Sequence, residues 1–172
     1  RYWRDWSSDV CSSDLVFLLS FMALTMVSAQ KSIPSVDLKN LDGQIVNTNS
    51  FIQNGKITVV SFWATWCTPC KRELEIYHEI YEDWVEKYGL EIVAITIDNS
   101  RQLPKIKPLV AQQGWEFTIL SDVNQDLMKQ LNFTFIPQTY ILDKEGKVVF
   151  DHSGFAPGDE YEMEKILDEL MK

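Results

Sequence analysis

Residues 57–73 read Ile-Thr-Val-Val-Ser-Phe-Trp-Ala-Thr-Trp-Cys-Thr-Pro-Cys-Lys-Arg-Glu, and this stretch decides the fold. Its first eight residues are nearly all apolar or β-branched, which predicts a strand buried on both faces. Pro69 suits the first turn of a following helix, where its missing N–H costs nothing. Apolar residues then recur at helical spacing up to Gly89. We therefore expect a strand over 57–64 and a helix from about Pro69 to Gly89.

Cys67 and Cys70 lie where this strand ends and the helix begins. The N-terminus of a helix carries free N–H groups and the positive end of its dipole, and both favour a thiolate over a thiol. We therefore expect Cys67, as the exposed, N-terminal member, to attack substrate disulfides. Cys70 follows one turn later and is expected to be better buried, so it would resolve the mixed disulfide. Thr68 and Pro69 separate the two thiols and set their geometry.

The cysteine pair has two other interpretations. A zinc site normally takes four ligands, and the remaining candidates are Cys11, His78 and His152, none of which lies at ligand spacing. A static disulfide that closes so small a loop would constrain little of the unfolded chain. The pattern therefore favours a redox pair, and no metal or cofactor is expected.

Outward from this segment, strand and helix patterns alternate along the chain. Asp42-Gly43 between alternating apolar positions predicts an N-terminal β-hairpin over 36–46. Further strands are expected at 92–97, 117–120, 138–142 and 148–150. Further helices are expected at 101–113, interrupted or bent near Pro104 and Pro108, at 123–131, and at 159–171, with Tyr161, Ile166, Leu167 and Leu170 inside. This order predicts one α/β domain with a mixed central sheet and helices on both faces.

The segment from Val60 to Glu73 resembles the active-site segment of the thioredoxin superfamily, and more closely that of the TlpA/ResA-like extracytoplasmic proteins. The likeness runs from about Val36 to the C-terminus. It includes the N-terminal hairpin, the run Trp66-Cys67-Thr68-Pro69-Cys70, Glu73, the pair Ile136-Pro137 and the hairpin at 143–147. The resemblance implies a thioredoxin fold with an N-terminal β-hairpin extension and the activity of a thiol:disulfide oxidoreductase.

The resemblance also implies a substrate-binding surface beside the cysteines. Pro137 would be cis, and Ile136 would offer its backbone N–H and C=O to an extended substrate. The alternative is an ordinary proline at the start of a strand. Trp66 is expected to cover the nucleophile and to contact substrates, together with Thr68 and Pro69.

Glu73 lies three residues after Cys70, on the same face of the predicted helix. The resemblance implies an acid that moves protons for the cysteines. A first-turn acid that is merely stabilised by the helix dipole fits the spacing equally well. Many thioredoxins carry a buried aspartate on the preceding strand, and Ser61 stands at the matching position here. Because serine does not ionise, the proton role of Glu73 becomes more attractive.

The first thirty residues are expected to lie outside the domain. The apolar run over 15–27 ends in Val27-Ser28-Ala29, which predicts an export signal over 1–29, and an uncleaved membrane anchor is the alternative. Residues 1–14 lack an initial Met and look like a translated sequencing adapter, which would leave Cys11 without meaning. The thioredoxin-like domain then spans 30–172 and is expected in the periplasm.

The formal net charge of the 172 residues is −9, from 16 basic and 25 acidic side chains, and this argues against a nucleic-acid partner. Together with the resemblance, we expect a monomer that reduces disulfides of exported proteins, such as apocytochrome c during cytochrome c maturation. A membrane-bound donor would supply the electrons. A thiol peroxidase of peroxiredoxin-like type would need a Pro-x-x-x-Thr/Ser-x-x-Cys segment, which precedes neither cysteine of the pair. A non-catalytic binding or chaperone module is the other alternative.

Overall fold

The computed structural model describes residues 31–172. The predictions of an export signal over 1–29, of an adapter remnant over 1–14 and of a meaningless Cys11 lie outside the described residues. Within the described part, no helix is both long enough and apolar enough to cross a membrane.

A seven-stranded mixed sheet forms the centre of the molecule, in the order β2-β1-β5-β4-β3-β6-β7. β3 pairs in parallel with β4 and antiparallel with β6, so it lies in the middle of the sheet. The N-terminal hairpin β1–β2 extends the sheet by pairing antiparallel with β5. The strands are β1 (Asp37–Asn40), β2 (Ile45–Asn47), β3 (Thr58–Trp63), β4 (Glu91–Thr96), β5 (Thr118–Ser121), β6 (Gln138–Leu142) and β7 (Val148–Ser153).

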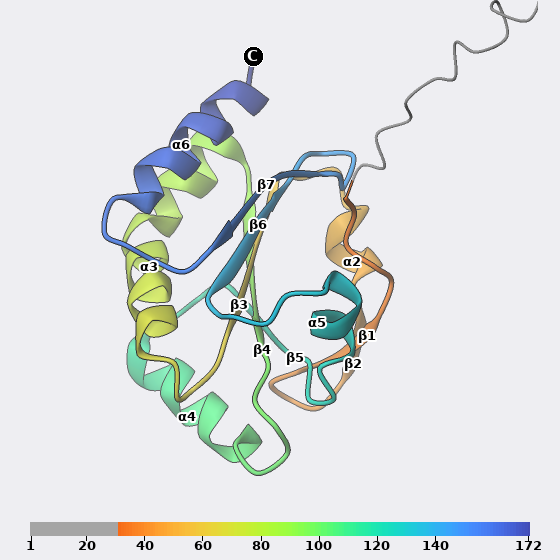
Figure 1. Ribbon diagram of the computed structural model, residues 1–172. Coiled ribbons are helices and arrows are strands. Elements are labelled where there is room, and N and C mark those ends of the chain that lie inside the picture. The colour runs from red at the N-terminus through yellow and green to blue at the C-terminus, as the bar shows by residue number, and fades with distance from the viewer. Residues whose placement is uncertain (1–30) are drawn as a thin grey trace, which may run out of the picture.

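Helices cover both faces of this sheet. Figure 1 shows α3, α4 and α6 on one face, and α2 and α5 on the other. The helices are α2 (Asn49–Ile52), α3 (Thr68–Tyr88), α4 (Leu103–Gln113), α5 (Asp126–Leu131) and α6 (Asp159–Leu170). The predicted α/β architecture with an N-terminal hairpin extension is therefore confirmed.

The strand and helix that carry the cysteines form where the sequence predicted them. All six residues of β3 are buried, which is the burial expected of a central strand between two helical layers. Pro69 lies in the first turn of α3, and Gly89 ends the helix in the left-handed conformation with its N–H bonded to the carbonyl of Val85. The buried residues of α3 include Leu74, Tyr77, Trp84 and Tyr88, which recur at helical spacing.

The helices differ from the expectations in three places. α4 was expected to be interrupted or bent, and the interruption is absent: Pro104 lies in its first turn, where no N–H is needed, and Pro108 removes only one bond inside the helix. In α6, Tyr161 was expected inside but is 66% exposed. Leu167 is fully buried as expected, Ile166 and Leu170 are partly buried against the core, and Met163 is buried as well. The short helix α2 was not predicted, because four residues are too few for a periodic pattern.

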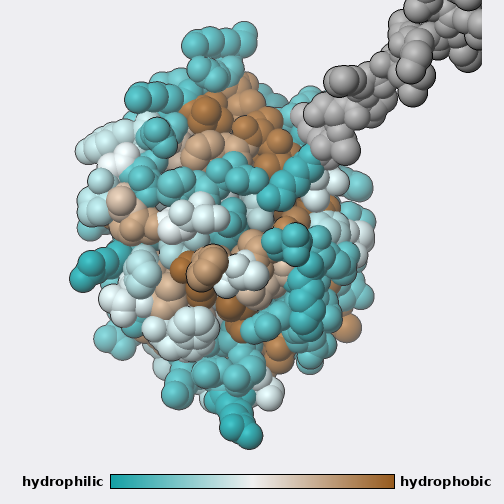
Figure 2. All heavy atoms as spheres, in the orientation of Figure 1, coloured by the Kyte–Doolittle hydropathy of each residue, from teal (hydrophilic) through white to brown (hydrophobic). Residues whose placement is uncertain are grey.

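Most large apolar side chains lie in one core between the sheet and its helices, and Trp63 is fully buried there. On the face shown in Figure 2, hydrophobic residues gather in small patches among hydrophilic ones. Two of the exposed large hydrophobic residues are Trp66, which directly precedes Cys67, and Phe135, which directly precedes Ile136; they are 61% and 77% exposed.

Candidate active site

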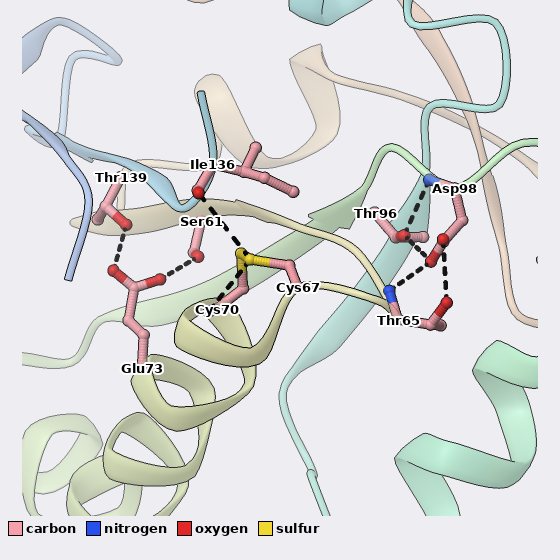
Figure 3. Close-up of a disulfide and its surroundings, with 9 residues drawn as sticks. All are labelled: Ser61, Thr65, Cys67, Cys70, Glu73, Thr96, Asp98, Ile136 and Thr139. Atoms are coloured by element: carbon pink, nitrogen blue, oxygen red, sulfur yellow. Dashed lines mark hydrogen bonds between the residues drawn. A yellow bond between two sulfur atoms is a disulfide. The ribbon is translucent and has the colours of Figure 1, made fainter. Parts of the chain in front are cut away.

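The two cysteines of the motif form a disulfide at the N-terminus of α3 (Figure 3). Cys67 is the N-cap of the helix, and its Sγ accepts the backbone N–H of Cys70 at 3.3 Å. The sulfur thus lies against free helical N–H groups, where negative charge is favoured. The expectation that Cys67 is exposed needs correction: it is 5% exposed, against 0% for Cys70. The order of exposure is as predicted, but in the disulfide form both sulfurs lie under the surface.

The loop before β6 lies directly across from Cys67. The peptide bond between Ile136 and Pro137 is cis, as the resemblance implied. The carbonyl oxygen of Ile136 lies 3.9 Å from the Sγ of Cys67, and Figure 3 shows this carbonyl aimed at the sulfur. The structure therefore brings Ile136, Pro137 and Cys67 together from parts of the chain about seventy residues apart.

The residues expected to contact substrates surround the disulfide on its outer side. Trp66, Thr68 and Pro69 are all exposed, and Trp66 directly precedes Cys67. Phe135, which precedes Ile136, is exposed as well. An apolar rim therefore lies on both sides of a sulfur that is itself almost covered.

Glu73 lies inside the protein, one turn along α3 from Cys70, and is 2% exposed. Ser61 Oγ donates to its Oε2 at 2.7 Å, and Thr139 Oγ1 donates to its Oε1 at 2.9 Å. Tyr77 adds a third donor from the next turn of α3, at 3.1 Å. All three donors are side-chain hydroxyls. Because α3 begins at Thr68 and has no acidic residue in its first turn, the interpretation of Glu73 as a first-turn acid merely stabilised by the helix dipole is wrong.

The hydroxyls around Glu73 follow from strand register. Ser61 on β3 and Thr139 on β6 are direct partners across the antiparallel ladder, so their side chains point to the same face of the sheet. The side chain of Glu73 extends from α3 toward this pair (Figure 3). Ser61, which stands where many thioredoxins have an aspartate, thus hydrogen-bonds the acid that reaches the same place from the helix.

Burial raises the pKa of Glu73 from its ordinary value to about 7, because a charged carboxylate loses its hydration inside the protein. The hydrogen bonds from Ser61, Thr139 and Tyr77 oppose this effect, since they favour the charged form. A carboxyl group with a pKa near neutral exists in both protonation states at the pH where thiols react. Such a group can accept and return a proton.

A second buried carboxylate supports the loop that leads into the cysteine motif, and the sequence analysis missed it. Asp98 follows β4 and is fully buried. Its carboxylate accepts the backbone N–H of Thr65 at 2.8 Å and the hydroxyl of Thr65 at 3.0 Å, and Thr96 donates to it at 2.7 Å. An acid directly after a buried parallel strand was the available signal, because the carboxyl ends of neighbouring parallel strands share one edge of the sheet.

No group of three or more metal-binding side chains gathers anywhere in residues 31–172. His78 and His152 lie on different elements, α3 and β7, and His152 pairs with Asp159 at 3.1 Å. The site has instead what disulfide exchange requires: two cysteines that form a disulfide, a helix N-terminus, and a nearby acid whose pKa is about 7.

Comparisons with known proteins point to the same chemistry. The model of the AhpC/TSA family matches residues 29–151. The thiol-disulfide oxidoreductase ResA of Bacillus thuringiensis subsp. konkukian is 30% identical over 124 residues, which cover 72% of this chain and 69% of that protein. ResA of Bacillus anthracis is 31% identical over 119 residues, covering 69% of this chain and 66% of that protein.

Solved structures agree with the fold. A thioredoxin-like protein from Porphyromonas gingivalis is 40% identical, with a TM-score of 0.72 over 80% of this chain and 90% of that chain. A structure described as a putative thiol:disulfide interchange protein DsbE from Chlorobium tepidum is 26% identical, with a TM-score of 0.71 over 82% of this chain and 96% of that chain.

Proposed function

The chain belongs to the AhpC/TSA family and is a thiol-disulfide oxidoreductase with a thioredoxin-like fold, and from this premise we propose that it reduces disulfides of exported proteins. Its clients would be unfolded or partly folded chains outside the cytoplasm, with apocytochrome c as one candidate. The observation that carries the proposal is the Cys67–Cys70 disulfide at the N-terminus of α3, with the carbonyl of Ile136 beside its outer sulfur.

In the proposed reaction the thiolate of Cys67 attacks one sulfur of the client disulfide. A mixed disulfide forms, and the other client sulfur leaves as a thiolate that takes up a proton. The thiolate of Cys70 then attacks the sulfur of Cys67, and the second client sulfur leaves and is protonated. The client gains two electrons and two protons, and the enzyme is left with the Cys67–Cys70 disulfide. A membrane-bound dithiol donor would return it to the reduced form.

Glu73 would serve the second half of this reaction. The thiol of Cys70 must lose its proton before it can attack, and it is fully buried away from water. Glu73 lies one turn along the same helix face and has a pKa of about 7, raised by burial. It could therefore take the proton from Cys70 directly or through a water molecule, and return it when the disulfide is reduced again.

Ile136 and the apolar rim would hold the client. Its backbone groups would pair with an extended client segment, because the residue before Pro137 lies opposite the sulfur of Cys67. Trp66 and Phe135 would cover apolar client side chains on either side. These features favour an unfolded stretch of chain over a small, compact substrate.

The reduction potential of the Cys67–Cys70 pair tests the direction of the reaction. Equilibration of the purified protein with glutathione or dithiothreitol buffers, followed by alkylation and mass spectrometry, gives the potential directly. A reduction potential of about −250 mV or lower supports a reductase, since that of thioredoxin is about −270 mV. A value above about −150 mV, close to that of DsbA, would assign the opposite direction.

Turnover of hydrogen peroxide with an added dithiol tests the peroxidase alternative. For Cys67, such a segment would place the proline at position 60 and the Thr/Ser at position 64, where this chain has Val60 and Ala64. We therefore expect consumption of peroxide no faster than that of a free dithiol. Undiminished function of a double Cys67→Ser, Cys70→Ser variant would point instead to a binding or chaperone module.

A further inference from the structure

A groove of about 560 Å³ borders the cysteine motif, and apart from Trp66 its lining residues have no role in the reaction described so far. One wall is the loop residues Thr65 and Trp66, which directly precede Cys67. The other wall is helix α4 along its whole length, from Gln102 just before it to Gln112 near its end. We call it the α4 groove. Its volume is within the range of about 300–1,000 Å³ that is typical of ligand sites.

One face of α4 supplies the helical wall. Pro104, Pro108 and Gln112 are four residues apart and form one row along the helix, and Lys105 and Leu109 form the row beside it. The opposite side of the same helix carries the buried residues Ile106 and Val110. The groove is thus a fixed surface, because a helix that is anchored in the core presents it.

The chemistry of the lining is apolar with a single positive charge. Trp66, the two prolines and Leu109 supply the apolar surface, and the remaining lining residues are uncharged apart from Lys105. Within residues 31–172, Lys105 makes no ion pair, whereas the nearby Lys107 pairs with Asp42 at 2.8 Å. A groove lined by one unpaired cation and no carboxylate is unusual in a chain with a net charge of −9.

We propose that the α4 groove binds the client segment that flanks the reacting cysteine, and that it selects an apolar residue followed or preceded by Asp or Glu. The inference rests on the proposed reduction of client disulfides. A client whose sulfur bonds to Cys67 pairs with Ile136 on one side and crosses Trp66 on the other. Each extended residue spans about 3.3–3.6 Å, so residues two to four positions from the client cysteine reach the groove.

Charge and shape then have separate roles. The apolar client residue packs between Trp66 and the prolines of α4, where burial of apolar surface stabilises the complex. The client carboxylate pairs with the ammonium group of Lys105 at the rim, where such a pair improves selectivity and the rate of encounter more than affinity. The groove therefore discriminates among clients, while the chemistry at the sulfurs stays the same for all of them.

Three disulfide-linked peptide dimers test this proposal. Their sequences are Asp-Leu-Ser-Cys-Ser-Leu-Asp, Lys-Leu-Ser-Cys-Ser-Leu-Lys and Ser-Gly-Ser-Cys-Ser-Gly-Ser, so that the flank is presented in both directions. The value of kcat/KM for each peptide is divided by that for 2-hydroxyethyl disulfide, which is uncharged and too small to reach the groove. We expect the acidic peptide to have a ratio about tenfold above that of the lysine peptide, and a lead that shrinks as salt is added.

Three variants locate the effect. Lys105→Glu should abolish or invert the preference for the acidic peptide, and Lys107→Glu, on the same helix but paired with the hairpin, should leave it unchanged. Gln112→Trp should fill the groove and lower the ratio for both leucine peptides. Equal ratios for the acidic and lysine peptides in the wild type would overturn the proposal. Equal shifts in the two lysine variants would also overturn it, because the effect would then be that of overall charge.

Binding without chemistry separates this proposal from the proposed function. The same peptides with their cysteines alkylated can be titrated into the oxidised protein by calorimetry. Preferential binding of the acidic leucine peptide supports the groove even if no disulfide is turned over, in which case the proposed function alone has failed. Equal binding of all three peptides overturns the groove even if turnover is rapid.

Discussion

Ser61 Oγ donates a 2.7 Å hydrogen bond to Oε2 of Glu73, and both groups are buried beside the cysteine pair. The serine comes from the central strand and the acid from the helix that begins at Cys67. The structure thus supplies from α3 the ionisable group that many thioredoxins place on the strand. A hydroxyl at position 61 supports this acid, because it leaves room for the carboxylate and donates to it.

The first prediction concerns the dependence of stability on pH. The pKa of Glu73 is about 7 in the folded protein, raised by burial, against an ordinary value near 4.5. Between these values the folded state binds more protons than the unfolded state. The contribution of Glu73 to the free energy of unfolding should therefore be greatest below pH 4.5, and it should be lost as the pH rises through about 7. The loss is on the order of 3 kcal/mol.

Glu73→Gln should remove this loss, because the amide is neutral at every pH. Urea unfolding of the wild type and of Glu73→Gln at pH 5 and pH 8 measures this loss as the difference between their free energies of unfolding. The free energy of unfolding of the variant relative to the wild type should be higher at pH 8 than at pH 5. The exposed Glu75→Gln serves as the matched control on the same helix. A difference that is the same at both pH values would show that Glu73 does not titrate in this range.

The second prediction uses Ser61→Ala. Loss of a hydrogen bond to the charged form raises the pKa of Glu73 further. If Glu73 accepts the proton of Cys70, the midpoint of the pH profile for disulfide exchange should move to higher pH. Stopped-flow measurement of tryptophan fluorescence between pH 5 and 9 follows the reaction. Ser61→Thr, which keeps a hydroxyl, should restore most of the original profile, and a variant that only loosened the core would lower the rate without moving the midpoint.

The third prediction concerns Asp98 as a positioning residue. Its carboxylate fixes Thr65 through two hydrogen bonds, and Thr65 lies two residues before Cys67. Asp98→Asn should lower the free energy of unfolding by about 2 kcal/mol, since bonds to a charged group are worth about 1.5–3 kcal/mol each. It should also lower the rate with 2-hydroxyethyl disulfide, because the loop that carries Cys67 loses its anchor.

Asp122→Asn is the control for that experiment. Asp122 accepts the backbone N–H groups of Asp126 and Met128 at 2.8 and 3.0 Å. It therefore holds the start of α5, and neither of these bonds involves the loop that carries Cys67. Its loss should cost comparable stability and leave the rate unchanged. Equal effects of the two variants on the rate would mean that Asp98 acts only through general stability.

The local features of the site could be read from the sequence because each depends on neighbouring residues. A buried strand, a helix-starting proline and two cysteines one turn apart lie within fourteen residues. The hydroxyl cage of Glu73 could not be read in the same way. It requires that Ser61 and Thr139, 78 positions apart in the numbering, meet as partners between β3 and β6, and strand register is set by tertiary packing.

The same distinction explains what the sequence analysis missed. Asp98 is a single acid after a strand, and nothing near it in the chain names Thr65 as its partner. In α6 the apolar residues Met163, Ile166, Leu167 and Leu170 recur at helical spacing, whereas charged residues stand three and four positions after Tyr161. The hydrophobic pattern itself therefore favours the stripe through Met163 and Leu167, which is the buried one, and the expectation that Tyr161 lies inside departed from that pattern.

The fourth prediction tests the burial of this stripe by unfolding in urea. Leu167→Ala should lower the free energy of unfolding by about 2–5 kcal/mol, because the residue is fully buried and truncation leaves a cavity. Tyr161→Ala should change it by no more than about 0.5 kcal/mol, since the ring is exposed. The opposite order would place the buried stripe of α6 on Tyr161.

The fifth prediction identifies which cysteine attacks first. Cys70 is fully buried, whereas Cys67 is 5% exposed and is flanked on its outer side by the exposed rim residue Trp66. An incoming disulfide must reach the thiolate in line with its own S–S bond, so it can reach Cys67 with the smaller movement of the protein.

Cys70→Ser should therefore accumulate a mixed disulfide with 2-hydroxyethyl disulfide, seen as a mass increase that dithiothreitol removes. Cys67→Ser should form no such adduct on the same timescale. If the adduct formed faster on Cys67→Ser, the roles of the two sulfurs would be exchanged, and Glu73 would lie beside the attacking thiol rather than the resolving one.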